Sequence, residues 1–147
     1  MIRIRRSRAS DADAVLGIWR RAVDATHDFL STEDRAAIDQ EVQVLLPRLD
    51  LWVAVDQNDR PTGFMSLSDS SLDALFIDPA MHGTGIGRAL VDFALRSSSY
   101  LRTEVNEQNE KAVAFYRRLG FREVGWSLID GQGRPYPLVH MRLDPAS

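Results

Sequence analysis

Three glycines stand at alternate positions in the stretch HGTGIGRAL, residues 82–90, and Arg88 follows them. A helix that begins here would present unpaired backbone N–H groups and a partial positive charge to an anion. Glycine lets the backbone approach that anion closely and adopt positive φ. Arg88 would add a charged donor for a phosphate. The stretch therefore predicts a phosphate-binding loop at a helix N-terminus.

Three phosphate ligands compete for this loop. A nucleoside triphosphate loop needs Lys and Ser or Thr after its last glycine, whereas Arg88 and Ala89 follow Gly87. A dinucleotide loop has the spacing G-x-G-x-x-G after the first strand, and this stretch has neither that spacing nor that place. Coenzyme A remains as a candidate, beside a glycine-rich turn that binds nothing.

Three further residues could carry acid–base chemistry. Alternation along LRTEVN places Glu104 on one strand face with Arg102 and Asn106, where it could act as a base or be a solvated strand residue. Asp73, on the neighbouring strand, competes for the same role. Tyr116 lies seven residues after Asn109 on the same helix face, either as an acid or as a core tyrosine.

The composition excludes other chemistries. The chain has 147 residues and no cysteine, which rules out a disulfide framework, a thiolate zinc site and a cysteine nucleophile. The three histidines lie far apart without ligand spacing, so we expect no metal. A net charge of −3 predicts no nucleic-acid partner. No apolar run approaches a membrane span, so we expect no membrane association and a cytoplasmic protein.

Periodicity and turn residues predict the elements that position these groups. Two helices precede the glycine loop, one capped by Ser10 with Asp13 in a box-like arrangement, the other capped by Ser31 or Thr32 and ended by Pro47. Two follow it, one running to about Ser98, the other over 109–120 with Gly120 as its left-handed cap. The predicted strands are Ile2–Arg6, 51–55, 62–68, Leu72–Ile77, 100–106, 121–129 and 136–143.

Helical spacing also predicts which side chains face the core. On the first helix these are Val15, Ile18, Trp19, Ala22 and Val23, and on the second Ile38, Val42, Leu45 and Leu46. The order β-α-α-β-β-β-α-β-α-β-β differs from a doubly wound fold. It predicts one domain over residues 1–147, with an antiparallel meander and one parallel crossover pair.

The stretch LFIDPAMHGTGIGRAL, followed by LRTEVNEQNEKAVAFYRRLGF, resembles the GNAT superfamily of N-acetyltransferases, which use acetyl-CoA. The phosphate motif of that superfamily is matched by His82, Gly85 and Gly87, with His82 where the superfamily usually has Arg or Gln. Its second motif is matched in full, by Asn109, Ala112, Tyr116, Gly120 and Phe121. The resemblance implies an α/β (α+β) fold, a mixed, mostly antiparallel, twisted sheet of six to seven strands flanked by four helices. It further implies a V-shaped opening between strands 72–77 and 101–106.

The resemblance also implies the donor site and the catalytic groups. Backbone N–H groups of about Phe76 and Ile77 would hold the acetyl carbonyl, and those of residues 83–88 the pyrophosphate. Tyr116 would be the acid that protonates the departing thiolate, and Glu104 the base. The residues expected to bind coenzyme A are Leu75, Phe76, Ile77, His82, Gly83, Thr84, Gly85, Ile86, Gly87, Arg88, Asn109 and Tyr116.

The acceptor would be a primary amine, of a small molecule or a protein, acetylated directly in a ternary complex. In the family, the loop between the first two helices helps to form the acceptor site, and other positions could line it. The expected acceptor residues are His27, Asp28, Phe29, Trp52, Asp73, Asn106 and Tyr136. An acyl-CoA-binding sensor of the same fold is the alternative function. The protein would be a monomer or a homodimer.

Overall fold

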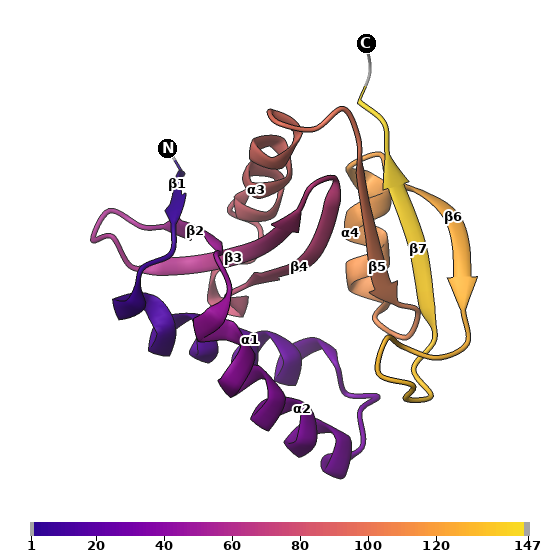
Figure 1. Ribbon diagram of the computed structural model, residues 1–147. Helices are drawn as coiled ribbons and strands as arrows, with labels where there is room; N and C mark the ends of the chain where they lie inside the picture. The colour runs from indigo at the N-terminus through magenta and orange to yellow at the C-terminus, as the bar shows by residue number, and fades with distance from the viewer. Residues whose placement is uncertain (1, 146–147) are drawn as a thin grey trace. The chain divides into compact units, whose positions relative to one another are not determined.

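The computed structural model describes residues 2–145 and contains a seven-stranded sheet with four α-helices (Figure 1). The hydrogen-bonded strand order is β1-β2-β3-β4-β5-β7-β6. In chain order the elements are β1 (Arg3–Arg6), α1 (Ala12–Thr26), α2 (Thr32–Leu45), β2 (Trp52–Val55), β3 (Pro61–Ser68), β4 (Ser71–Ile77), α3 (Ile86–Leu95), β5 (Leu101–Asn106), α4 (Glu110–Arg118), β6 (Arg122–Ser127) and β7 (Leu138–Leu143). The predicted fold class and element order are confirmed.

The sheet is mixed, as the order of its strands requires. β4 and β5 pair in parallel through Ser71–Arg102 and Leu72–Thr103. The pairs β1–β2, β2–β3, β5–β7 and β6–β7 are antiparallel. The predicted crossover through α3 is therefore confirmed, since two parallel strands need such a connection. The V-shaped opening farther along these two strands stays a prediction.

The described chain forms two compact units. The first comprises the chain up to Ser66 together with Ala74–Val91, and the second comprises Leu67–Asp73 and the chain from Asp92 onward. The first unit contains the glycine loop, and the second contains Glu104 and Tyr116. A single domain over 1–147 stays a prediction.

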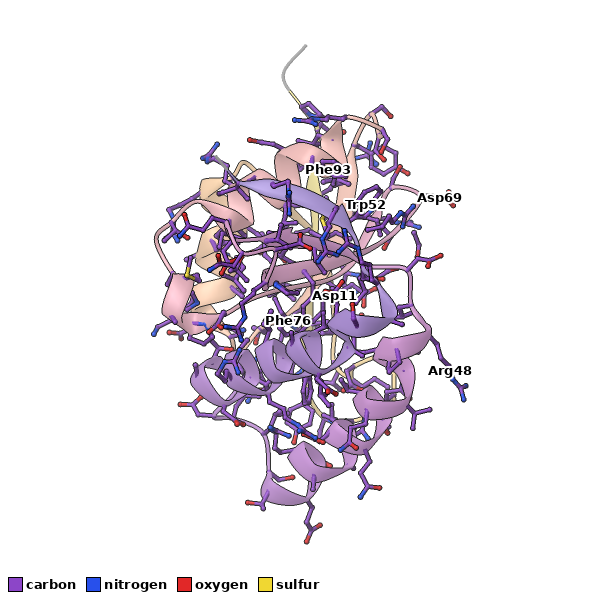
Figure 2. The ribbon with its side chains drawn as sticks, turned by 90° about the vertical axis from the view of Figure 1, so that its left-hand side faces the viewer. Asp11, Arg48, Trp52, Asp69, Phe76 and Phe93 are labelled. Atoms are coloured by element: carbon purple, nitrogen blue, oxygen red, sulfur yellow. The ribbon has the colours of Figure 1, made fainter. Side chains whose placement is uncertain are left out.

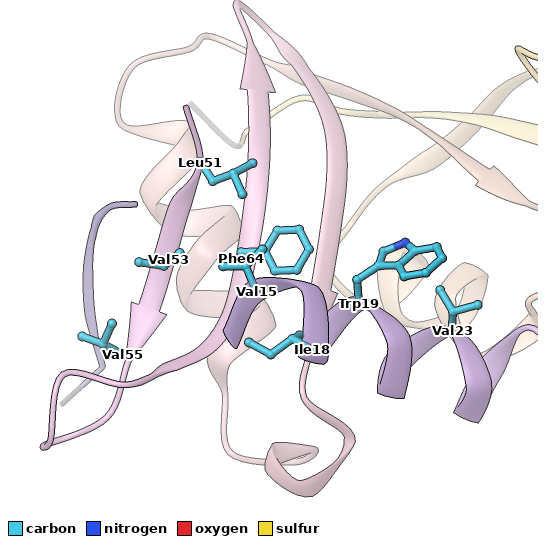
Figure 3. Close-up of a cluster of buried hydrophobic side chains, with 8 residues drawn as sticks. All are labelled: Val15, Ile18, Trp19, Val23, Leu51, Val53, Val55 and Phe64. Atoms are coloured by element: carbon cyan, nitrogen blue, oxygen red, sulfur yellow. The ribbon is translucent and has the colours of Figure 1, made fainter. Parts of the chain in front are cut away.

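The core of the first unit is built where one face of α1 packs on β2 and β3 (Figure 3). Periodicity predicts five inward residues on this helix, and all five are buried. Burial of such side chains contributes about 1.5–3 kcal/mol each to folding. The members of the cluster are Val15, Ile18, Trp19, Val23, Leu51, Val53, Val55 and Phe64.

The start of α1 differs from the prediction. Ser10 does not cap it, because residues Ala9–Asp11 form a 3-10 turn and α1 begins at Ala12. The buried carboxylate of Asp11 instead accepts from the N–H of Arg8 at 2.7 Å and from both terminal nitrogens of Arg5. These Arg5 hydrogen bonds are the largest cause of the lowered pKa of Asp11. Asp11, not Ser10 or Asp13, therefore supplies the side-chain acceptor at this turn, and Arg5 pairs with it.

The second helix has the boundaries that the sequence predicts, but one of the side chains predicted to face the core does not. Ser31 caps α2 by accepting from the N–H of Asp34 at 3.1 Å, and Pro47 lies in the 3-10 turn that follows the helix. Ile38, Val42 and Leu46 pack against the core. Leu45 is 53% exposed, so its predicted inward orientation is wrong.

The second unit is an antiparallel sheet of β5, β7 and β6, on which α4 lies against β5 (Figure 1). Along β5, Leu101, Thr103 and Val105 are buried, whereas Arg102 and Glu104 are exposed. The predicted alternation is confirmed. Gly120 has φ of +104°, and the N–H groups of Gly120 and Phe121 donate to the carbonyls of Arg117 and Tyr116. This closing motif confirms Gly120 as the left-handed cap of α4.

Candidate active site

The glycine loop joins the end of β4 to the start of α3 and has the backbone that its sequence predicts. Gly83 and Gly85 have φ of +79° and +86°, a region in which other residues are strained. Residues 82–85 are exposed. A Cβ at Gly83 would meet nothing within 4 Å. The loop is therefore kept open by backbone conformation, not by packing.

The N–H groups of this loop fall into two sets. Those of Met81, His82 and Thr84 donate to carbonyls of the preceding turn, and that of Ala89 makes the first hydrogen bond of α3. Among the hydrogen bonds of residues 2–145, none uses as donor the N–H of Gly83, Gly85, Ile86, Gly87 or Arg88. Unused donors at the start of a ten-residue helix fit the pyrophosphate of coenzyme A.

An ion pair anchors the loop to α1. Asp78 follows β4, accepts from the N–H of Ala80 at 3.2 Å and receives a hydrogen bond from Arg21 Nη2 at 2.9 Å. Burial acts to raise the pKa of Asp78, but the Arg21 guanidinium and the Ala80 N–H lower it overall. His82, the unusual residue of the motif, adds a further lowering effect on that pKa. Asp78 therefore remains ionised and holds the turn before the glycines.

The strand before the loop places Leu75, Phe76 and Ile77 at the end of β4. The Phe76 ring packs on Phe64 with centroids 5.6 Å apart and against the core of the first unit (Figure 2). The next N–H, that of Asp78, donates to the carbonyl of Thr62 at 2.9 Å. The contribution of these three residues to donor binding stays a prediction, because it concerns their backbone groups with substrate bound.

The second unit has a cavity of about 660 Å³ on the sheet face that carries Glu104. Both candidate bases of the sequence line it, Asp73 from β4 and Glu104 from β5. The full lining consists of Ser71, Leu72, Asp73, Arg102, Thr103, Glu104, Val124, Gly125, Trp126, His140 and Met141. Two carboxylates in one open cavity favour a cationic ligand such as an ammonium group.

The two carboxylates differ in their surroundings. Both oxygens of Asp73 already accept hydroxyl hydrogen bonds, from Ser68 at 2.5 Å and from Ser71 at 2.6 Å. The Glu104 side chain is 56% exposed, and its Oε1 lies 3.5 Å from Nδ1 of His140. Glu104 therefore has more acceptor capacity open to the cavity than Asp73, and which of the two acts as the base stays a prediction.

Tyr116 lies on α4, buried, with its ring edge-to-face against Phe121 at 5.1 Å. Burial raises the pKa of Tyr116, while a hydrogen bond with the Thr103 side chain acts to lower it. Thr103 Oγ1 in turn donates to the carbonyl of Leu72 at 2.8 Å. The phenol thus stays protonated over the ordinary pH range, as a proton donor requires. The structure confirms the core position of Tyr116, and its role as the acid stays a prediction.

Asn109 has a structural role that its motif position does not reveal. It is the residue before α4, it is buried, and its Oδ1 accepts from the N–H of Ala112 at 3.2 Å. The side chain therefore caps the helix that carries Tyr116. Its expected contact with coenzyme A stays a prediction.

The expected acceptor residues do not all lie on one surface of one unit. His27 ends α1, its Nδ1 lies 2.7 Å from Thr26 Oγ1, and its ring is 5.2 Å from that of Phe29. Trp52 lies on β2 with the Arg6 guanidinium 4.1 Å from its ring centroid (Figure 2). These residues and Asp28 belong to the first unit. Their contact with an acceptor stays a prediction.

The remaining acceptor candidates belong to the second unit. Asn106 ends β5, and its carbonyl accepts from the N–H of Asn109. Tyr136 is buried, and its N–H donates to the carbonyl of Arg134 at 2.8 Å. Asp73 is the one acceptor candidate that lines the cavity with Glu104.

Among the cavity residues that were not predicted for the site are Trp126 and His140, whereas Arg102 was expected only on the strand face of Glu104. Trp126 is 54% exposed, and its indole N–H donates to Glu107 at 2.5 Å. His140 lies directly opposite Glu104 in the pairing of β5 with β7. This cross-strand partnership depends on register between segments about 35 residues apart, and local patterns do not encode it.

Neither a metal-binding cluster nor a membrane-spanning helix occurs among the described residues. Within residues 2–145, no three His, Asp or Glu side chains are grouped as a metal ion would require. Over the same residues, none of the helices has both the length and the apolarity to cross a bilayer.

Comparison with known proteins adds to this geometry. A family model described as an acetyltransferase (GNAT) domain matches residues 21–144. Peptidyl-lysine N-acetyltransferase YjaB of Escherichia coli (strain K12) is 51% identical over 141 residues, which cover 96% of each chain. The solution structure of apo-form YjaB from Escherichia coli superposes with a TM-score of 0.95, at 50% identity and 99% coverage of each chain.

A more distant structure shows the same fold. It is yncA, a putative acetyltransferase from Salmonella typhimurium, solved with acetyl-CoA. It superposes with a TM-score of 0.65 at 21% identity, over 100% of this chain and 95% of the other.

Proposed function

The chain belongs to the GNAT acetyltransferase family, and from that premise we propose that it acetylates the side-chain amine of lysine residues in proteins. Membership confirms the predicted enzyme class, an acetyl-CoA-dependent N-acetyltransferase. The proposal adds the acceptor class and the residues that act on it. Its structural basis is the second-unit cavity in which Glu104 and Asp73 face one open space.

Two observations support a lysine acceptor. The E. coli relative at 51% identity is named a peptidyl-lysine N-acetyltransferase. The cavity offers carboxylates for an ammonium group, and the exposed apolar residues Val124 and Trp126 at its rim suit the aliphatic part of a lysine side chain.

The donor is assigned to the first unit. The N–H groups of Gly83, Gly85 and the first turn of α3 would hold the pyrophosphate of acetyl-CoA, with Arg88 as a charged donor. Backbone N–H groups at the end of β4, from Phe76 and Ile77, would stabilise the oxyanion that forms on the acetyl carbonyl. The acetyl-CoA bound in the yncA structure shows that this fold accommodates the donor.

Transfer is direct in this proposal, because a chain without cysteine cannot form a cysteinyl acyl-enzyme. The Glu104 carboxylate takes one proton from the lysine ammonium, and the neutral nitrogen attacks the thioester carbonyl carbon. A C–N bond forms, and the C–S bond breaks when the tetrahedral intermediate collapses. Tyr116 gives its phenolic proton to the thiolate and recovers one from the new amide nitrogen. Glu104 releases its proton to solvent.

The test is a comparison of acceptors by the rate of thiol release from acetyl-CoA. The panel contains an N-terminally blocked peptide with one lysine, a lysine-free peptide with a free N-terminus, and a polyamine. The proposal expects the lysine peptide to be fastest and Tyr116→Phe to slow its reaction. Preference for the free N-terminus or the polyamine would contradict the acceptor class. Binding of acetyl-CoA without turnover on any amine would favour the acyl-CoA sensor instead.

A further inference from the structure

We infer that His140 is a positioning residue for Glu104, and that Ser127 fixes the orientation of the imidazole. The inference rests on the proposed function, because it assumes that Glu104 is the base. The three side chains come from three adjacent strands of the second unit, β5, β7 and β6. Glu104 is distant in sequence from the other two. Ser127 and His140 lie on the two strands that the closing hairpin loop joins.

Register brings the three side chains to one face. Glu104 and His140 are directly opposite in the antiparallel β5–β7 pair, so their side chains project to the same side of the sheet. On the other side of β7, His140 lies opposite Gly125, and Ser127 is two residues farther along β6. The imidazole therefore lies between a carboxylate on one neighbouring strand and a hydroxyl on the other.

The contacts define what each ring nitrogen does. Nδ1 of His140 lies 3.5 Å from Oε1 of Glu104, and Nε2 lies 2.6 Å from Oγ of Ser127. An ionised carboxylate only accepts, so the nitrogen that faces it carries the hydrogen. In the tautomer with its hydrogen on Nδ1, Nε2 accepts from the Ser127 hydroxyl. Both ring nitrogens are thereby assigned a partner, and the ring is fixed about its side-chain torsions.

The bulge in β6 makes room for this arrangement. The register of the β6–β7 pair shifts between Glu123 and Gly125. A Cβ built at Gly125 would lie 3.5 Å from Cβ and 3.7 Å from Cγ of His140, already in van der Waals contact. A longer side chain there would occupy the space over which the ring reaches Ser127. Bulges commonly redirect side chains beside functional sites.

The consequence concerns Glu104. A half-exposed glutamate on a strand samples several rotamers, and only some of them point a lone pair at a bound amine. A donor held 3.5 Å from one carboxylate oxygen restricts those rotamers and leaves the other oxygen free. His140 is 32% exposed in its side chain and lines the same cavity, so it is near the acceptor without being required to react.

The experiment is a double-mutant cycle between His140→Ala and Glu104→Gln, measured as kcat and KM with acetyl-CoA and a single-lysine peptide. His140→Ala should lower kcat about tenfold, the size of a typical coupling between contacting groups, with the KM for acetyl-CoA unchanged. In the Glu104→Gln background it should cause no further loss. His140→Asn should restore most of the rate, because its amide can donate near the position of Nδ1.

Controls separate positioning from folding. Arg142→Gln changes the next residue of β7 on the same face, where the arginine contacts Asp144 and Tyr100, and it should leave kcat unchanged. Ser127→Ala provides a second cycle with Glu104→Gln that leaves the imidazole in place, and it should lower kcat by a smaller factor than His140→Ala. Thermal unfolding of every variant identifies those that do not fold.

The outcomes distinguish the two levels of the account. Equal losses from His140→Ala in both backgrounds, or an Asn variant as slow as the Ala variant, would overturn the positioning role while leaving Glu104 as the base. If Glu104→Gln turns over as fast as the unmodified protein, then the assignment of the base fails, and the inference fails with it.

Discussion

Tyr116 has a core position, and the proposed mechanism also gives its hydroxyl the role of the acid. Its ring packs against Phe121, and its hydroxyl is paired with Thr103. Burial raises the pKa of this phenol, so the hydroxyl keeps its proton over the ordinary pH range, as the proposed donation to a thiolate requires.

At the residue scale we therefore expect Tyr116→Phe to impair chemistry more than binding. Loss of the acid should reduce kcat roughly 100-fold, within the usual range for one general acid. The KM for acetyl-CoA should change little, and stability should fall by only about 1 kcal/mol for the lost hydrogen bond. Steady-state kinetics and urea unfolding measure these effects. A Phe variant with full kcat would remove Tyr116 from the mechanism.

The cavity residues show which parts of the candidate site could be predicted from the sequence. Glu104 and Asp73 were both predicted as candidate bases, and both line the cavity. Alternation along one strand was sufficient, because the side-chain period of a strand is local. His140 was not predicted, since its place opposite Glu104 follows from the pairing of two distant strands. Long-range register is the information that local patterns lack.

At the scale of the element, the shape of the glycine loop is set by the positive φ angles of Gly83 and Gly85. Gly85 has φ of +86° and an almost open environment, since the nearest atom to a Cβ added there would be Ile2 Cδ1 at 4.0 Å. A side chain there is strained by its backbone and not by a clash. The same reasoning explains why the glycine pattern was readable from sequence, because positive φ is required locally.

Gly85→Ala should accordingly weaken donor binding while the fold persists. Strain of about 1–2 kcal/mol at a left-handed position corresponds to roughly a fivefold to thirtyfold rise in the KM for acetyl-CoA. Gly131→Ala is the matched control, since a Cβ there meets nothing within 4 Å and its φ is not positive. Titration calorimetry with coenzyme A and steady-state kinetics test the difference. Equal coenzyme A affinities for the two variants would contradict the loop assignment.

Elements whose boundaries rest on tertiary contacts were predicted less well. Ser10 is a residue type that caps helices, yet it lies within the 3-10 turn Ala9–Asp11, where the Asp11 carboxylate pairs with the Arg8 N–H and with Arg5. Leu45 has the right spacing for burial on α2, yet the helix is covered by the core only through Ile38, Val42 and Leu46. The helices themselves and the cap at Gly120 follow from the sequence, because periodicity and positive φ are local.

At the scale of the whole molecule, we expect the pair of Arg5 and Asp11 to make stability depend on pH. Their side chains are 14% and 8% exposed, and their N–O distance is 2.8 Å. The pKa of Asp11 is lowered, chiefly by the hydrogen bonds from Arg5. The stabilisation is therefore complete above the unfolded Asp pKa of about 3.9 and is lost as pH falls through the lower pKa of the folded state.

Asp11→Asn should reduce the free energy of unfolding at pH 7 by about 3 kcal/mol, because a largely buried arginine loses its main partner. Asp59 still accepts two hydrogen bonds from Arg5, one at its carboxylate and one at its backbone carbonyl, and these limit the loss. The difference between the two proteins should shrink as pH is lowered below 4, which urea unfolding at pH 7 and pH 3 measures. Asp24→Asn, in an ion pair whose aspartate is 63% exposed, should cost under about 1 kcal/mol. Equal losses from the two substitutions would contradict the assigned importance of the Arg5–Asp11 pair.

The glycine loop belongs to the first unit, and Tyr116 and Glu104 belong to the second. The central claim is that the acetyl group of acetyl-CoA passes to a lysine side chain. The most direct test is an internal competition in one peptide that carries both a free N-terminus and a single internal lysine. The peptide is incubated with isotope-labelled acetyl-CoA, and tandem mass spectrometry locates the label. The account predicts label on the lysine Nζ, absent with Glu104→Gln. Label on the α-amine, or no label on the peptide, would contradict it.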